Sequence, residues 1–421
     1  MKSICISAVS SNEGKTLLTT ALLHNFKNSV RAYKIGPDYI DPQFHEAICN
    51  KASINLDTFI MNKKQVNWIF NKYNDQEISI LEGVMGFYDG MDKGSSAYDV
   101  TKLLNVPTIL ILDGSGTYIT ISAVLKGLKT YKDDNTIKAV VINKLSSSMH
   151  FKLIKNQIEK DFDDIKVLGW IKNDLTSLKQ THLGLDLIDA NKDLLEDISN
   201  EILENIDINL LEEVANSEAN KPSSYPFDTF EKVNKKISII KDKNFSFIYH
   251  DNIKFLQELF EEVEFVNPSQ NQVISSDTHL VYIPGGYIET ERAYNQIKDS
   301  NEFKESLISH AKTKYIYAEC AGLLYLGKKV DEKEMTNILD VEFTLETKRT
   351  RLGYYYSDSG LKGHAFHYTK PLNTNNGINI LSKKENGKGE FGSWGKDKVY
   401  GTYLHTMFRN NINLIKDYFG I

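Results

Sequence analysis

A short run near the N-terminus has the residue types and order of a phosphate-binding loop. An apolar segment, residues 4–9, leads into Gly14, Lys15 and Thr16, and a helical pattern follows. At a helix start, backbone N–H groups and the lysine can bind phosphate oxygens, and the threonine hydroxyl can ligate Mg²⁺. A chance Gly-Lys-Thr is the alternative, but the strand–loop–helix context favours a nucleotide site. Its residues would be Ser11, Asn12, Glu13, Gly14, Lys15 and Thr16.

Acidic residues follow the next two strongly apolar segments. Asp38 and Asp41 come after the second expected strand, whereas Glu82 and Asp89 lie at and after the end of the third. Ligands of doubly wound sheets bind beyond the carboxyl ends of the strands, where carboxylates can hold Mg²⁺ against nucleotide phosphates. Each aspartate could instead be a turn residue beside Gly or Pro. Glu82 is the strongest candidate, because a carboxylate that ends an apolar strand needs a partner.

Cys320 lies between an apolar segment and a small-residue turn that opens a helical pattern. Such a sharp strand-to-helix turn presents a nucleophile at a helix N-terminus, where the helix dipole should lower the pKa of a cysteine. Free cysteines are usually buried and structural, which is what we expect of Cys5 and Cys49. For Cys320 this context instead indicates a nucleophile.

A cysteine nucleophile needs a base and an oxyanion hole. His405 closes an apolar segment near the C-terminus and is the expected base, with His364 and His367 as competitors. A lone histidine can also be a satisfied core or surface residue. The backbone N–H groups of Gly286, in a Pro-Gly-Gly turn, and of Ala321 are the expected oxyanion donors.

Short apolar segments alternate with amphipathic stretches in both halves of the chain, which predicts doubly wound α/β domains. Residues 216–235 contain two prolines among small polar residues and are expected to be a linker. The expected domains are therefore residues 1–215 and 236–421, the second opening with a strand at Lys236.

The bulk properties agree with a two-domain chain. The 421 residues are too many for one core, and a formal net charge of -6 argues against a broad nucleic-acid surface. Three cysteines are too few for a disulfide framework and indicate a reducing compartment. No stretch approaches about 18 uninterrupted apolar residues, so we expect a cytoplasmic protein without a membrane partner.

Taken together, these motifs resemble the cobyrinate a,c-diamide synthase family over nearly the whole chain. The resemblance implies an N-terminal dethiobiotin-synthetase-like P-loop domain and a C-terminal, flavodoxin-like class I glutamine amidotransferase domain. It also implies the reaction: two acetate side chains of a corrin ring, a and c, become amides, each at the cost of one ATP and one glutamine. Besides the loop at residues 8–16, the matching segments are 36–42, 55–57, 82–90, 182–185, 284–289, 318–322, 351–354 and 363–368.

The resemblance also implies roles for the site residues. Cys320 would be the glutaminase nucleophile and His405 its activator. The residues implied to bind Mg²⁺ are Thr16, Asp41 and Glu82, and those implied to bind the substrate or activate its carboxylate are Lys34, Asp38 and Asp89.

Several positions depart from the family pattern. Ala8 replaces the usual opening glycine of the loop, and Thr181 stands where the family often has arginine. Ala321 replaces a glycine and Ala365 a glutamate. Many class I glutaminases carry a glutamate two residues after the histidine; here that position is Met407, so a Cys–His dyad without a third carboxylate is expected.

Other substrates and one other class of protein remain open. The same chemistry could act on hydrogenobyrinate or nickel sirohydrochlorin, or on other side chains, as in cobyric acid synthase. A P-loop switch or partitioning ATPase with a silent amidotransferase-like domain is the alternative from a different class. A polycarboxylate macrocycle needs local positive charge, for which residues 348–351 are a candidate, with a solvated face as the alternative.

Overall fold

The fold is described here from a computed structural model. The structure describes residues 2–175, 180–181, 184–185, 192–216, 221–222, 224–373 and 376–421. His182 and Leu183 of the family segment 182–185 lie outside the described residues. The chain divides into two compact units, Met1–Pro226 and Phe227–Ile421. This division falls inside the expected linker, residues 216–235, and strand β10 (Val233–Ile240) begins three residues before Lys236.

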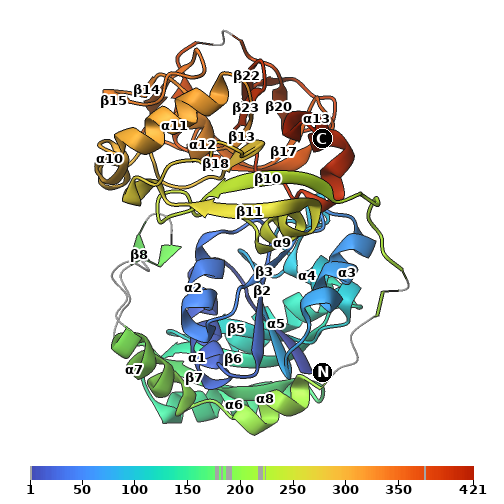
Figure 1. Ribbon diagram of the computed structural model, residues 1–421. Coiled ribbons are helices and arrows are strands. Elements are labelled where there is room, and N and C mark those ends of the chain that lie inside the picture. The colour runs from blue at the N-terminus through green and yellow to red at the C-terminus, as the bar shows by residue number, and fades with distance from the viewer. Residues whose placement is uncertain are drawn as a thin grey trace. The chain divides into compact units, whose positions relative to one another are not determined.

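A parallel sheet forms the centre of the first unit, drawn in blue to green in Figure 1. Its strand order is β3-β2-β4-β1-β5-β6-β7, and every neighbouring pair is parallel. The central strands are buried along nearly their whole length, as expected of strands covered on both faces by helices. The strands are β1 (Lys2–Ala8), β2 (Val30–Ile35), β3 (Ile54–Leu56), β4 (Ile78–Glu82), β5 (Thr108–Asp113), β6 (Ile137–Leu145) and β7 (Lys166–Lys172).

Helices connect these strands and bury their apolar sides against the sheet. Ile4 and Ile6 of β1 share one core with Leu18 and Leu22 of the first helix. The helices are α1 (Lys15–Asn25), α2 (Ile40–Cys49), α3 (Lys63–Tyr73), α4 (Ala97–Leu104), α5 (Thr120–Tyr131), α6 (Ser148–Asp161), α7 (Lys192–Leu203) and α8 (Ile208–Val214), with a short strand pair β8 (Gln180–Thr181) and β9 (Gly184–Leu185) before α7. The doubly wound α/β class is confirmed. The edge strand β3 was missed, so Glu82 ends the fourth strand along the chain rather than the third.

A second sheet forms the centre of the unit Phe227–Ile421, with the strand order β11-β10-β12-β13-β23-β22. All neighbouring pairs are parallel except β22–β23. The strands are β10, β11 (Phe260–Val266), β12 (Leu280–Ile283), β13 (Tyr315–Glu319), β22 (Ser393–Lys396) and β23 (Val399–Thr402), and the helices are α9 (His250–Leu259), α10 (Glu291–Ile297), α11 (Asn301–Ala311), α12 (Ala321–Leu326) and α13 (Ile412–Phe419).

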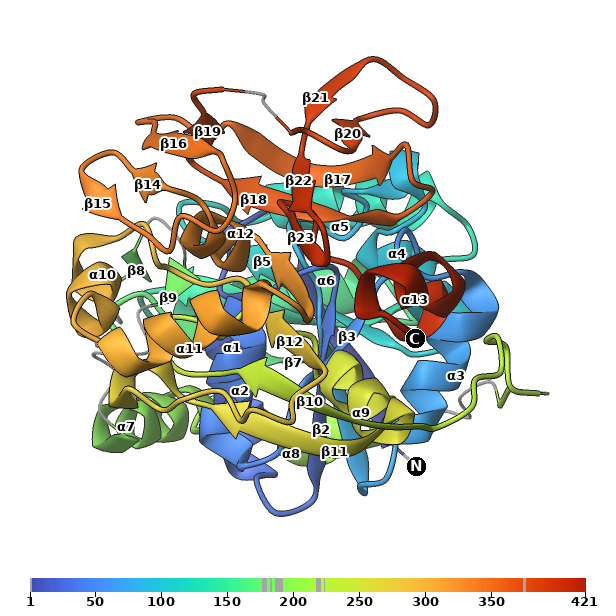
Figure 2. The same ribbon diagram turned by 45° about the horizontal axis from the view of Figure 1, so that its top comes forward.

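The second unit also carries small sheets that a doubly wound pattern does not predict. One has the order β15-β14-β16-β19 and another β18-β17-β20-β21. Figure 2 shows β17 and β18 running side by side as an antiparallel hairpin. The strands are β14 (Lys329–Val330), β15 (Lys333–Glu334), β16 (Glu342–Leu345), β17 (Arg351–Ser357), β18 (Lys362–His367), β19 (Thr369–Pro371), β20 (Ile380–Ser382) and β21 (Gly389–Phe391). In the described part of the chain, no helix has the length and hydrophobicity needed to cross a bilayer.

Candidate active sites

The loop between β1 and α1 is curled around Gly14, the N-cap residue of α1. Gly14 has a φ of 98°, and a Cβ atom added to it would lie 2.4 Å from Nδ2 of Asn143. Only glycine fits there without strain. Asn143 Nδ2 donates to the carbonyl of Glu13 at 2.7 Å, and Lys15 Nζ donates to the carbonyl of Ser10 at 2.8 Å. The loop thus has the compact shape and the folded-back lysine that phosphate binding requires.

The Lys34 ammonium group at the end of β2 joins the acidic residues expected from the sequence. Its Nζ lies 3.1 Å from Glu82 Oε1 and 3.7 Å from an Asp38 oxygen, and it also pairs with Asp41. Thr16 Oγ1 donates to the same Glu82 oxygen at 2.8 Å. These five residues therefore meet at the carboxyl ends of β2 and β4, beside the start of α1.

His45, a residue missed by the sequence analysis, completes this network. It is fully buried, its Nε2 lies 2.9 Å from Glu82 Oε2, and its Nδ1 lies 3.0 Å from Ser53 Oγ. Burial by itself raises the pKa of Glu82, but Lys34 and His45 outweigh it and hold that pKa below its usual range. The sequence did contain a signal for His45, namely its spacing from Asp41. His45 follows Asp41 by one turn of α2, so the two residues lie on the same helix face.

Two of the expected acidic residues also have local structural roles. Asp38 Oδ1 accepts the backbone N–H of Ile40 at 2.8 Å, at the start of α2. Asp89 Oδ2 accepts the N–H of Gly86 at 2.8 Å and closes a turn. The turn interpretation therefore holds for both residues, whereas a role in substrate binding stays a prediction.

The oxygen donors of Thr16, Asp41 and Glu82 fit Mg²⁺ chemically. They are hard donors that lie close together next to the phosphate-binding loop, since Thr16 bonds Glu82 and both Glu82 and Asp41 pair with Lys34. Among the described residues, no three or more His, Cys, Asp or Glu side chains are grouped to hold a metal ion by themselves. Mg²⁺ is usually held by one or two carboxylates and takes its other ligands from phosphates and water.

Cys320 sits in the second unit on a strained turn between β13 and α12. Its φ of 47° and ψ of −105° are unusual for a residue other than glycine. The backbone holds it there, since Cys320 N–H donates to the Thr402 carbonyl at 2.7 Å and the Cys320 carbonyl accepts from Leu324 at 3.0 Å. This is the nucleophile-elbow geometry that the sequence predicts.

His405 lies beside Cys320, with Gly285 between them. A Cβ atom added to Gly285 would lie 2.3 Å from Cε1 of His405 and 3.2 Å from Cβ of Cys320, so both side chains crowd the same α-carbon. The backbone N–H groups of Ala321 and Gly286 donate toward the Cys320 sulfur and favour its thiolate. The arrangement brings together the expected nucleophile, base and both expected oxyanion donors.

The expected low pKa of Cys320 is wrong. Burial raises the pKa of this thiol, and the charge of Glu289 raises it further, against the two backbone amides. Only 5% of Cys320 is exposed, and α12 has only six residues. Burial of Cys320 therefore favours the neutral thiol over the thiolate.

The two competing histidines, His364 and His367, lie on β18 of the β17–β18 hairpin and make other contacts. His364 pairs with His405 through the backbone, with N–H to carbonyl distances of 3.0 and 2.8 Å in the two directions. The His367 ring stacks on Tyr403 with centroids 3.7 Å apart, and its Nδ1 lies 3.0 Å from Thr350 Oγ1. Burial lowers the pKa of each to about 3, with help from His405 for His364 and from Arg351 for His367.

Comparison with known proteins agrees with these two sites. The profile of the CobQ/CobB/MinD/ParA nucleotide binding domain matches residues 4–183, and that of the CobB/CobQ-like glutamine amidotransferase domain matches residues 236–412. The cobyrinate a,c-diamide synthase of Saccharolobus solfataricus is 34% identical over 97% of this chain and 98% of its own. That of Fusobacterium nucleatum is 33% identical over the whole of both chains. The chain belongs to the cobyrinate a,c-diamide synthase family.

Both candidate sites fall within the segments that define this family. The nucleotide-binding segment contains the loop at Gly14 and the network around Glu82, and the amidotransferase segment contains Cys320 and His405. A nucleotide-binding domain and a glutamine amidotransferase domain are therefore both present.

Glu289 is a further acidic residue of the amidotransferase unit that sequence reasoning gave no role. It follows the Pro-Gly-Gly turn, and its Oε2 is buried without a hydrogen-bond donor among the described residues. Burial raises the pKa of this carboxyl from 4.5 to about 7. Above that pH the folded protein holds a poorly solvated charge near Cys320.

We expect Glu289→Gln to stabilise the protein at pH 8 and not at pH 4.5. The folded-state pKa lies above the usual value, so the unfolded chain ionises first and stability falls as pH rises from 4.5 to about 7. The neutral amide avoids this loss. The melting temperature at pH 8 should rise by at least about 2 °C, with the gain fading on acidification. An equal gain at both pH values would contradict a charge effect.

The side chains of the basic segment 348–351 differ in their exposure to solvent. Lys348 and Arg349 are exposed, whereas Arg351 is 7% exposed and donates to the Phe391 carbonyl at 2.9 Å. Thr350 bonds to the carbonyl of Thr369. The exposed positive charge of this segment thus comes from Lys348 and Arg349, and Arg349 also donates to the Tyr368 hydroxyl at 3.3 Å.

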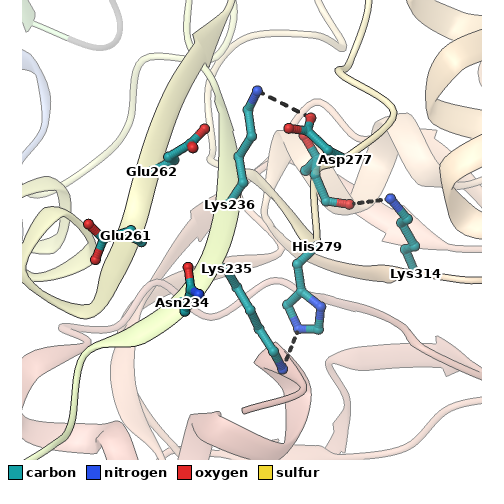
Figure 3. Close-up of a pocket in the computed structure, with 9 residues that line it drawn as sticks. Asn234, Lys235, Lys236, Glu261, Glu262, Asp277, His279 and Lys314 are labelled. Carbon is teal, nitrogen blue, oxygen red and sulfur yellow. Dashed lines mark hydrogen bonds and ion pairs between the residues drawn. The ribbon is translucent and has the colours of Figure 1, made fainter.

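A cavity of about 380 Å³ lies at the other end of the second sheet (Figure 3). Lys235, Lys236, His279 and Lys314 line it at the starts of β10, β12 and β13, opposite the strand ends that carry Cys320. Lys236 pairs with Asp277 at 3.3 Å, and Lys235 Nζ lies 3.4 Å from His279 Nε2. The cavity is thus separate from the Cys–His site of this family member.

Proposed function

We propose that the chain amidates the a and c acetate carboxylates of cobyrinate, using ATP and glutamine, in cobalamin biosynthesis. The observation that carries this proposal is the meeting of Cys320, His405 and the Gly286 and Ala321 amides in a chain that also has a phosphate-binding loop. The full-length relatives that carry the name cobyrinate a,c-diamide synthase support the choice of substrate. Residues 1–215 are assigned to the synthetase and 236–421 to the glutaminase, with 216–235 as the connection. We place the enzyme in the cytoplasm, since its three cysteines are all free.

In the glutaminase half, Cys320 attacks the side-chain amide carbon of glutamine. His405 takes the thiol proton as the carbon–sulfur bond forms, and the Gly286 and Ala321 amides stabilise the negative oxygen of the tetrahedral intermediate. His405 returns the proton to the departing nitrogen, which leaves as ammonia. Water then hydrolyses the thioester to glutamate, with His405 again as the base.

In the synthetase half, an acetate oxygen of the substrate attacks the γ-phosphorus of ATP. ADP leaves, an acyl phosphate forms, and ammonia displaces phosphate from it to give the amide. Lys15 and the loop amides hold the phosphates, and Lys34 offsets the charge of the reacting carboxylate. Thr16, Asp41 and Glu82 would hold Mg²⁺, which supplies charge neutralisation at the phosphates.

The alternatives differ in the substrate or in the second half. Hydrogenobyrinate or nickel sirohydrochlorin would require the same residues, and cobyric acid synthase chemistry would amidate other side chains. A P-loop ATPase with a silent amidotransferase-like domain has no use for the strained turn at Cys320 or for His405 beside it.

A time course on cobyrinate should show a monoamide that rises and falls before a diamide accumulates. One site must present two different carboxylates to the same γ-phosphorus, so the ring has to turn or to rebind between steps. Mass spectrometry of samples with ATP, Mg²⁺ and glutamine measures both products. Three or more new amides would refute the assignment. Failure with cobyrinate together with fast reaction of nickel sirohydrochlorin would instead assign the chain to that macrocycle.

A further inference from the structure

Glu319 is a buried carboxylate placed directly before the nucleophile, at the end of β13. It is 1% exposed, its Oε2 accepts the Tyr282 hydroxyl at 2.9 Å, and its Oε1 lies 3.4 Å from the Thr406 N–H that donates to it. The same Oε2 lies 3.5 Å from Nδ1 of His405. The charge of this group thus faces the ring nitrogen of His405 that the chemistry at Cys320 does not use.

His405 needs such a neighbour. It is 2% exposed, and it must carry a proton, and with it a positive charge, during each half of glutamine hydrolysis. A buried cation without a counter-charge is costly. The residue two positions further on, Met407, is apolar and 5% exposed, so it supplies no charge. Glu319 is the carboxylate that the described structure places within reach.

The arrangement also selects one tautomer of His405. The Glu319 charge, 3.5 Å from Nδ1, favours a proton on that nitrogen, which leaves the lone pair on Nε2. Nε2 would lie 3.0 Å from a Cβ atom added to Gly285, on the side that Cys320 shares. The nitrogen that must take the thiol proton is thereby the unprotonated one.

We propose that Glu319 is a positioning residue that orients His405 and stabilises its protonated form. The inference rests on the proposed function, since it assumes that His405 is the base for Cys320. The expected Cys–His dyad thus becomes a triad of Cys320, His405 and Glu319, in which the carboxylate belongs to the residue directly before the nucleophile. Other titratable groups around this site are the Cys320 thiol, Glu289, whose charge acts on Cys320, and the neutral His364 and His367 of β18.

Glu319→Gln is expected to lower glutamine-dependent turnover at least about 10-fold, by analogy with the loss of an orienting carboxylate in other triads. It should also move the acidic limb of the kcat/KM profile for glutamine to lower pH by about one unit, because His405 holds its proton less well without the charge. Glutamate release and ammonia-dependent amidation are measured on the same preparation. Ammonia-dependent amidation should not change.

Glu264→Gln is the matched control. This carboxylate lies in the same unit and bonds Ser238 and Ser275, away from His405, so neither the rate nor the limb should change. If the acidic limb of the kcat/KM profile did not move in Glu319→Gln, the proposal would be overturned even if turnover fell. Lost packing alone would lower the rate without moving that limb. Full glutaminase activity in Cys320→Ala would overturn the proposed function itself.

Tyr282→Phe tests the same idea in the opposite direction and does not depend on the folding of Glu319→Gln. Without the tyrosine hydroxyl, Glu319 concentrates its charge on His405, so the acidic limb should move to higher pH by a few tenths of a unit. A limb that stays or moves downward would contradict the role of Glu319.

Discussion

Cys320→Ala is expected to abolish amidation with glutamine and to leave amidation with ammonia at the wild-type rate. The substitution removes the Cys320 sulfur, whose side chain shares Gly285 with His405, so no thioester can form. The loss with glutamine should reach at least about 10³-fold, as for other nucleophile deletions. Amide formation is followed by mass spectrometry with glutamine and, separately, with ammonium chloride at alkaline pH.

A second buried free cysteine provides the control for this variant. Cys49 is 3% exposed on α2, and Cys49→Ala should retain activity with both nitrogen donors. Equal loss of both activities in Cys320→Ala would contradict the division into two sites. Retained glutamine-dependent activity would remove Cys320 from the reaction.

Glu82→Gln is expected to lower the rate of amidation at least about 10²-fold with either nitrogen donor, glutamine or ammonia. Its carboxylate joins Lys34, Thr16 and His45 at the end of β4, and a neutral amide cannot balance the Lys34 charge or serve as a strong metal ligand. Initial rates with saturating ATP and with each nitrogen donor measure the effect.

Glu77 lies on the exposed stretch just before the same strand and offers a matched change. Glu77→Gln should leave both rates unaltered, because the side chain is outside the network. If Glu82→Gln kept more than about half of the wild-type rate, the synthetase site would have to lie elsewhere.

The turn at Cys320 and the loop at Gly14 could be predicted because each depends on local sequence, whereas the catalytic roles of Cys320 and His405 stay predictions. An apolar strand followed by small residues and a helix specifies the turn at Cys320, and Gly14 with Lys15 specifies the loop. Glu82 was found by a burial argument: a carboxylate ending an apolar strand must have a partner. The same argument applies to Glu319, which also ends an apolar strand.

Other features depend on contacts between distant segments, which local patterns do not contain. His45 reaches Glu82 only after α2 packs beside β4, and Glu319 meets His405 only when β23 pairs with β13. The error about the pKa of Cys320 has the same origin. A helix start indicates stabilisation of a thiolate, but the depth of burial that outweighs it comes from the whole unit. The small antiparallel sheets around β17 were also missed, because β20 and β21 have only three residues each and the pairing of the longer β17 and β18 is set by neighbouring segments.

The neutral resting state of Cys320 also bears on how the protein withstands chemical damage. Peroxides and alkylating agents react with thiolates and hardly with thiols, and 5% exposure leaves them little access to the sulfur. A buried sulfur that is kept as a thiol is therefore a poor target for oxidants. The strained turn at Cys320 thus holds the sulfur at a helix start while it leaves little of it open to reagents in solution.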